Sequence, residues 1–483
     1  MIRIAQREID EPLFQAANVR FGGSCCVWTA ALAFFVGLIA FWSGQSSLLS
    51  FFLPAAYLAI VFAFVRTLHT WQDPFNPLCL VLIVGVVRFL LPGILILNGT
   101  EPTGEGMVLF RSKLSDSDWE WGNALALVGI LAVVLGWFLI QRGPRVEKHL
   151  KFNLSDSVMY TSLAGMLVGA VALFAFVVTN ASLGVIRSGD FRATTIQVGT
   201  GKYFFLAYLL IAGGVLVSSY LLAYGRTILS MAPLIVTALL YWVLGGRSRA
   251  MTPIAGGLLL LWYLGREQKA WERLALTPKY IAVGLLVPLC IVWLSYVGLM
   301  YRGGFGFGAF SEALSVSGFW QHVKESIFSD LGQLHSLAGA IAIGPGVLAG
   351  HTFIGALGWP LSKVVSLPER SAGVFIVEEL LGFGKDQERW GLNASLIGDA
   401  YLNFGFSVVV IVMLLFGALL KILYLKFRQD NLHAALYTLA LLSAVQTFWV
   451  SIEVWPQALT VIGFAVSLIV LGNTIFSVKS ARP

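Results

Sequence analysis

Residues 122–140 read GNALALVGILAVVLGWFLI, an apolar run without a charged side chain that is followed at 141–145 by QRGPR. A bilayer core about 30 Å thick is crossed by about 20 apolar residues of α-helix, because each residue adds about 1.5 Å. Only helices and closed barrels satisfy their backbone hydrogen bonds in that environment. The run therefore predicts a membrane-spanning helix that meets basic residues where it ends.

Comparable runs recur along the chain and predict about twelve spans in all. The others lie at 25–43, 48–65, 77–97, 157–179, 204–223, 228–244, 250–264, 280–299, 404–424, 433–450 and 457–477. Only 12% of the residues are charged and the mean hydropathy is +0.82, whereas soluble domains carry about 25% charged residues. The sequence predicts an all-α polytopic membrane protein whose residues 1–483 form one integral membrane domain.

Lys and Arg, which tend to remain on the cytosolic side, indicate the orientation of these spans. With the first 20 residues in the cytosol, clusters such as Arg142 to Lys151, Arg266 to Lys279 and Lys421 to Arg428 also fall inside. Both termini are then cytosolic. The long connection at 300–403, between the ninth and tenth spans, faces outward.

Helices are expected within this large outer loop. The stretch 309–328 and the stretch from Val374 to Leu381 have the pattern of interfacial helices. Between them, 331–362 has no Asp, Glu, Lys or Arg, but Gly344-Pro345-Gly346 interrupts it. We expect two helices or a re-entrant element here rather than a thirteenth span.

Arginines are unexpectedly frequent beside the outer ends of the spans. One alternative is that each reaches lipid headgroups or pairs with a nearby carboxylate. Several from different loops favour a shared anionic ligand, because guanidinium offers a fork of donors to phosphate and neighbouring glycines let backbone N–H groups approach. A lipid diphosphate fits, and the arginines would stabilise it as a leaving group without a metal. The candidates are Arg187, Arg192, Arg247, Arg249, Arg302 and Arg389.

Transfer of a glycosyl group also needs a base to accept the proton of an acceptor hydroxyl. His335 is the first candidate, against the alternative of a structural hydrogen bond; its rivals are His351, Asp330, Glu388 and Asp399. Tyr401 and Asn393 are candidates for binding sugar hydroxyls, a role open to Asp399 as well.

Other chemistries lack their motifs. There is no Walker A sequence, no HExxH and no His/Cys/Asp/Glu cluster with the spacing of metal ligands, and the glycines at 303–308 lack the Rossmann spacing. We therefore expect no metal, no cofactor and no nucleic-acid partner. Arg88, alone within a span, is expected to face protein or water and to be a structural ion-pair partner.

Three short motifs resemble one family. They are Gly246-Arg-Ser-Arg249 in a short outer turn, Arg302 at the start of the outer loop, and Asn393-Ala-Ser-Leu-Ile-Gly-Asp-Ala-Tyr-Leu-Asn-Phe-Gly405 before a span. Together with the layout of the spans they resemble the O-antigen and oligosaccharide repeat-unit polymerases, and the related O-antigen ligases are similar. The usual Ser-Arg-Gly turn reads Ser-Arg-Ala here, so either Arg247 or Arg249 is the equivalent arginine.

The resemblance implies a metal-independent, inverting glycosyltransferase of the GT-C class in the bacterial plasma (inner) membrane, with its active site facing the periplasm or cell exterior. Such an enzyme moves a glycan from undecaprenyl diphosphate onto a lipid-linked repeat unit and so builds a surface polysaccharide. Its partners would be those lipid-linked oligosaccharides, membrane lipids, a chain-length regulator and a flippase. The alternatives are an O-antigen ligase and a twelve-helix transporter of lipid or polysaccharide.

Overall fold

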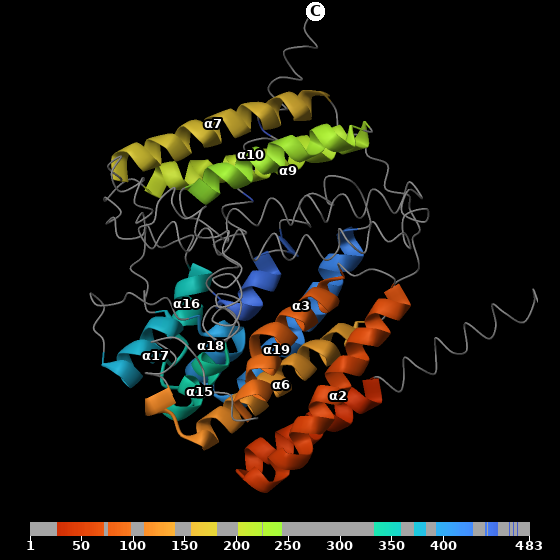
Figure 1. Ribbon diagram of the computed structural model, residues 1–483, viewed down its shortest axis with the longest axis vertical. Helices are drawn as coiled ribbons and strands as arrows, with labels where there is room; N and C mark the ends of the chain where they lie inside the picture. Colours follow the sequence, from red (N-terminus) through yellow and green to blue (C-terminus); the bar gives the residue numbers. More distant parts are fainter. Residues whose placement is uncertain are drawn as a thin grey trace, which may run out of the picture. The chain divides into compact units, whose positions relative to one another are not determined.

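The computed structural model describes eleven stretches of the chain and three isolated positions, and every regular element in them is a helix (Figure 1). The described residues are 27–71, 76–97, 111–140, 156–180, 201–224, 226–243, 333–358, 371–382, 393–427, 440–441, 443–452, 463, 467 and 471. The chain divides into two compact units. Unit 1 comprises Met1–Arg145, Glu325–Leu425 and Ala444–Pro456, and unit 2 comprises Val146–Lys324, Lys426–Ser443 and Gln457–Pro483.

Five helical segments of the described residues are long and apolar enough to cross a membrane. They are α2 (Ser46–Trp71), the continuous α3 (Pro77–Gly85), η1 (Val86–Leu90) and α4 (Leu91–Leu97), α6 (Asp116–Leu139), α7 (Asp156–Asn180) and α19 (Phe406–Phe427). Shorter apolar helical segments lie at Val27–Ser43, at Leu206–Leu221 within α9 (Gly201–Ala223) and at Leu229–Tyr241 within α10 (Thr227–Val243).

These helices confirm the predicted class, an all-α membrane protein, and coincide with the predicted spans up to 244 and at 404–424. The predicted spans 250–264 and 280–299 lie outside the described residues, and 433–450 and 457–477 are described only in part. The total of twelve spans, the single domain and the sidedness stay predictions.

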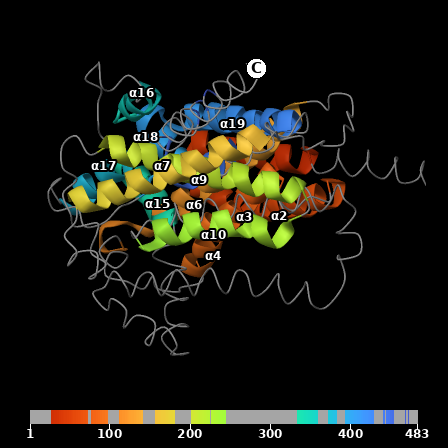
Figure 2. The ribbon, with the colours of Figure 1, turned by 90° about the horizontal axis from the view of Figure 1, so that it is seen from above.

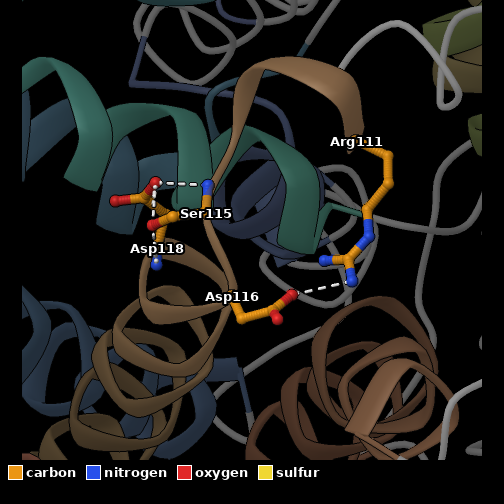
Figure 3. Close-up of polar contacts among 4 residues, drawn as sticks. All are labelled: Arg111, Ser115, Asp116 and Asp118. Atoms are coloured by element: carbon orange, nitrogen blue, oxygen red, sulfur yellow. Dashed lines mark hydrogen bonds and ion pairs between the residues drawn. The ribbon is translucent and has the colours of Figure 1, made fainter.

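Helix α6 begins at Asp116, several residues before the predicted start at 122. Ser115 and Asp118 form a capping box: the Asp118 N–H donates to Ser115 Oγ at 3.2 Å, and the Ser115 N–H donates to Asp118 Oδ2 at 2.8 Å (Figure 3). Arg111 pairs with Asp116 at 2.7 Å in the same view. Acidic side chains are stabilised at a helix N-terminus, so this end is polar and escapes a search for apolar runs.

Ser115→Ala is expected to lower the free energy of unfolding by about 1 kcal/mol, because it removes the cap of α6. Thermal unfolding of the purified protein in detergent measures the change. Ser407→Ala, at an exposed position of α19, is the matched control and should leave the transition where it is. Equal transitions in both variants would contradict the role of the cap.

Helix α6 is the core of unit 1, since 83% of its apolar window is buried. It packs against α2, α3 and α15. Two glycines bring α19 still closer, because a Cβ at Gly136 would collide with the Leu414 carbonyl and one at Gly417 with the Val133 carbonyl. Small residues allow membrane helices this approach of their backbones. These two glycines therefore let α6 and α19, which lie far apart in the sequence, pack closely together.

Lys421 is buried, although the sequence places it in a cytosolic basic cluster. It lies within α19, its exposed fraction is 3%, and its Nζ lies 4.5 Å from the centroid of the Trp137 ring. The helix continues to Phe427, so Lys421 faces an aromatic side chain of α6 instead of a loop. The cytosolic placement of Lys421 stays a prediction.

The stretch 331–362 contains two helices, as expected. They are α15 (Leu334–Ile343) and α16 (His351–Gly358), and Gly344 and Gly346 adopt φ values of 107° and 75° between them. Such values suit glycine, so the break is encoded locally. The helix predicted from Val374 is α17 (Ala372–Leu381), and α18 (Ser395–Phe404) follows. The helix predicted at 309–328 lies outside the described residues.

Helix α15 enters the bundle of unit 1. A Cβ at Gly93 would touch Asn123 and one at Gly85 would touch Ile130, so the α3–η1–α4 helix runs antiparallel to α6. Arg88 lies between Gly85 and Gly93 in this helix, and its carbonyl accepts the N–H of Gln333, which precedes α15. Further along α15, Ala338 lies against Gly122, which is nearer the start of α6. The N-terminus of α15 is therefore the deeper of its two ends. Its N-terminus lies level with the middle of α6, and the helix packs against α6, α17 and α18.

Unit 2 is described by α7, α9 and α10, which lie side by side in both views (Figures 1 and 2). A Cβ at Gly213 would lie 2.6 Å from the Ser162 carbonyl oxygen, so α7 and α9 also pack through a small residue. The Tyr241 hydroxyl donates to the Ala207 carbonyl at 2.8 Å and ties α10 to α9.

Candidate functional site

Several helices of unit 1 end close to one another. The N–H of Ser395, at the start of α18, donates to the carbonyl of Val450, where the helix at 444–449 ends, at 2.9 Å. The N–H of Gln333, at the start of α15, donates to the Arg88 carbonyl, also at 2.9 Å. The Arg88 guanidinium lies 3.9 Å from the centroid of the Trp449 ring, which joins the two pairs. We call this group, with Ser451 and Ile452, the helix-end junction.

A π-helical turn places Arg88 at the junction. In η1 the N–H of Leu91 bonds to the Val86 carbonyl, a spacing of five residues instead of four. Such a turn interrupts the regular ladder and leaves a carbonyl for another segment, here that of Arg88 for Gln333. The half-buried side chain stacks on Trp449. The arginine thus faces protein, as expected, and its described contact is an aromatic ring.

Asp399 ties α18 to two other segments. Its Oδ1 accepts from Thr352 Oγ1 at 2.6 Å and from Asn403 Nδ2 at 3.3 Å, and its Oδ2 accepts from the Ile452 N–H at 3.1 Å. The side chain is fully buried, and burial raises its pKa to about 6 although these donors and Ser451 act in the opposite direction. The predicted catalytic or sugar-binding acid is therefore also a structural link.

His335 lies in the first turn of α15 with an exposed fraction of 6%. Burial lowers its pKa to about 4. Its imidazole is therefore neutral at physiological pH, but a general base is most effective with a pKa near the working pH, so the low pKa does not by itself favour the base role. Helices α15 and α18 pack together, since a Cβ at Gly398 would lie 3.0 Å from a methyl of Leu337. The fold thus brings the helices of His335 and Asp399 into contact.

Replacement of Asp399 and replacement of His335 are expected to change the slope of the free energy of unfolding against pH in opposite directions. The raised pKa of Asp399 contributes stability that is full below pH 3.8 and is lost as the pH rises through 6. The lowered pKa of His335 contributes stability that is full above pH 6.5 and is lost as the pH falls through 4. Between pH 4 and 6 the two slopes oppose each other, each at about 1.4 kcal/mol per pH unit.

Asp399→Asn should accordingly leave a stability that rises with pH across this window, and His335→Gln one that falls. Unfolding temperatures in detergent at several pH values measure both slopes. Wild-type pH profiles in both variants would contradict the assignment of these groups.

The remaining described candidates lie on or beside α18. Tyr401 is 8% exposed, and burial raises its pKa. Its carbonyl accepts the N–H of Gly346, which holds the turn between α15 and α16 against α18. Asn393 lies half-buried just before α18, and His351 is exposed at the start of α16. Tyr401 and Asn393 thus share the α18 segment with Asp399.

The other predicted site residues lie outside the described residues: Arg187, Arg192, Arg247, Arg249, Arg302, Asp330, Glu388 and Arg389. Their convergence on a diphosphate stays a prediction. Within the described part of the chain, no group of three or more His, Cys, Asp or Glu side chains is arranged to hold a metal ion.

Sequence reasoning missed the polar partners of Asp399 and the contacts of Arg88 with Gln333 and Trp449. Thr352 carries no signal in the sequence, because it meets Asp399 only through the packing of α16 on α18. Asn403 lies one turn after Asp399 in the same helix, and this four-residue spacing was the signal that could have indicated it. Arg88 had a signal, since a charged residue inside an apolar span marks a functional position by default.

Comparison with protein-family models, with curated proteins and with solved structures gives no match for this chain.

Proposed function

We propose that this protein polymerises lipid-linked oligosaccharide repeat units by inverting, metal-independent glycosyl transfer at the outer face of a bacterial plasma membrane. Outer-face arginines would hold the diphosphate of the undecaprenyl carrier, with Arg302 and either Arg247 or Arg249 foremost. His335 would accept the proton of the attacking hydroxyl. Asp330 and Asp399 are the other candidate catalytic residues, and Tyr401 and Asn393 would bind the sugars.

One observation supports this proposal above the others: α15, a helix too short to span a membrane, carries the buried His335 into a bundle of apolar helices. Soluble enzymes and simple membrane anchors have no need of such an element. A reaction between two lipid-linked substrates does, because the reacting groups have to meet at the membrane and away from water.

Deletion of the gene in a strain that makes the polysaccharide tests the proposal. The lipid-linked glycans are extracted and their lengths are compared with those of the parent strain. Loss of a polymerase leaves single lipid-linked repeat units, whereas loss of a ligase leaves long lipid-linked chains. Long chains in the deletion strain would therefore contradict a polymerase and support a ligase.

The helix-end junction favours one alternative from another class. Transporters bind substrates where interrupted helices meet inside the bundle, and unit 1 has such a meeting point beside Arg88. Loss of a transporter would leave unpolymerised repeat units on the cytosolic side of the membrane, whereas loss of a polymerase would leave them on the outer side. Accessibility of those units to a membrane-impermeant glycosidase in everted and right-side-out vesicles separates the two functions.

A further inference from the structure

We propose that the Asp399 carboxylate is a proton-sensitive tie: its ionised form holds Ser451 and Ile452, which follow the helix at 444–449, against α18, and its protonation releases them. The inference does not rest on the proposed function. It gives Asp399 a conformational role that holds whether or not this residue takes part in catalysis.

Four hydrogen-bond donors converge on this one carboxylate. Its Oδ1 accepts from Thr352 Oγ1 at 2.6 Å and from Asn403 Nδ2 at 3.3 Å, and its Oδ2 accepts from the Ile452 N–H at 3.1 Å. The Ser451 hydroxyl also donates to this side chain. A carboxylate has about four lone-pair sites, so the ionised form of Asp399 accepts all four bonds. The protonated form carries an O–H that must itself donate, so at least one of the four bonds is lost or reversed.

The chemistry of the donors decides which bond changes. Asn403 Nδ2 donates to Thr352 Oγ1 at 2.6 Å, and the Thr352 N–H donates to Asn403 Oδ1 at 3.3 Å, so the partners of Oδ1 form a closed network. We therefore expect the proton on Oδ2. There the Ser451 hydroxyl can rotate and accept the new O–H, whereas the Ile452 N–H can only donate and loses its acceptor.

Helix α16 has a further link to α18 that does not involve this carboxylate. The Tyr401 carbonyl accepts the Gly346 N–H at 3.1 Å, which holds the turn before α16 against α18. Ile452 lies beyond the end of the helix at 444–449, and its bond to Asp399 joins that end to α18. Protonation is therefore expected to free the segment at 451–452 while α16 stays in place.

Burial sets the pH at which the tie responds. Asp399 is fully buried and its donors are neutral groups, so desolvation disfavours the charged form and raises the pKa of Asp399 to about 6. Both forms are then populated near that pH. Protonation also removes a buried charge, so the free energy of unfolding rises as the pH falls even though the bond from Ile452 is lost.

Other titratable groups on the elements packed against α18 have to be distinguished from Asp399. They are His335 on α15, His351 on α16, Glu378 and Glu379 on α17, and Tyr401 on α18 itself. Burial lowers the pKa of His335 to about 4 and raises the pKa of Tyr401, so both stay neutral near pH 6. Helix α6 contacts α18 around Gly129, in its uncharged part, and the Arg88 guanidinium lies over the Trp449 ring. Variants of His351 and Glu378 therefore serve as controls.

Hydrogen–deuterium exchange of the full-length protein in detergent tests the release. Mass spectrometry follows peptides that contain Ile452, and the rates are corrected for the intrinsic effect of pH on exchange. We expect the protection of these peptides to fall about tenfold between about pH 7.5 and about pH 5, because a hydrogen bond to a charged group is lost. The midpoint should lie near pH 6. Peptides from α19 should show no such change.

Variants assign the effect to the carboxylate. Asp399→Asn offers one acceptor and one donor, as the protonated acid does, so its peptides should exchange fast throughout the range. Thr352→Val removes a donor to the ionised form and should move the midpoint upward by about one pH unit. Thr352→Ser keeps the hydroxyl and should keep the midpoint of the wild type. His351→Gln, one residue away and exposed, and Glu378→Gln should also keep it.

A pH-dependent release that persists in Asp399→Asn, or that disappears in His351→Gln, would overturn the proposal. If Asp399→Asn does not fold, the two Thr352 variants decide, because equal midpoints in Thr352→Val and Thr352→Ser would contradict a role of the carboxylate. The lengths of the lipid-linked glycans in the deletion strain test the polymerase separately.

Discussion

Arg302→Ala is expected to abolish the proposed polymerisation and to leave single lipid-linked repeat units instead of a ladder of long chains. A leaving diphosphate gains charge as the glycosidic bond breaks, and removal of one fixed donor to such a charge typically costs about a hundredfold or more in rate. Arg249→Ala should act in the same way if Arg249 is the turn arginine. Gel analysis of glycans from complemented deletion strains measures the loss.

Arg111→Ala is the control for these arginines, because Arg111 is 40% exposed and already paired with Asp116. It should preserve the ladder. Comparable protein levels in the membrane exclude a folding defect as the cause of any loss. A normal ladder in both Arg302→Ala and Arg249→Ala would contradict the assignment of the diphosphate site.

Gly122→Leu is expected to lower both the stability of the protein and its activity. A Cβ at Gly122 would lie 2.8 Å from the backbone nitrogen of Ala338, which cannot move without the rest of α15. The larger side chain forces α15 away from α6. Overpacking of this kind costs about 1–3 kcal/mol or more, and here it also displaces His335. We expect both a lower unfolding temperature and loss of the glycan ladder.

Gly463→Ala is the control, because a Cβ at Gly463 would meet nothing within 4 Å. It should retain the wild-type stability and ladder. Gly122→Ala offers an intermediate step, with a smaller fall in stability than Gly122→Leu. If Gly122→Leu unfolds at the wild-type temperature, the close packing of α15 on α6 is wrong.

The long apolar helices and the break between α15 and α16 were predictable because their signals are local. An apolar run such as 122–140 or 404–424 encodes a helix through its own composition, and Gly344 and Gly346 encode a break through their conformational freedom. The capped start of α6 at Asp116 was missed because the polar first turn carries no apolar signal.

The candidate site was predictable only as separate residues. His335 and Asp399 stand out in the sequence as titratable groups among apolar neighbours. That their helices touch, that Thr352 and Ile452 donate to Asp399, and that Gln333 bonds to Arg88 are contacts between distant segments. Such contacts depend on how the helices pack and leave no trace in local composition.

The central place of α6 has a consequence for biogenesis. This helix leaves the ribosome early, yet α15 and α19, which cover much of it, are synthesised only near the end of the chain. While translation continues, its glycine-lined faces at Gly122 and Gly136 have no native neighbours. The first spans must therefore wait in the lipid or beside the insertion machinery as an open assembly. Completion of unit 1 is then a late event in the synthesis of the chain.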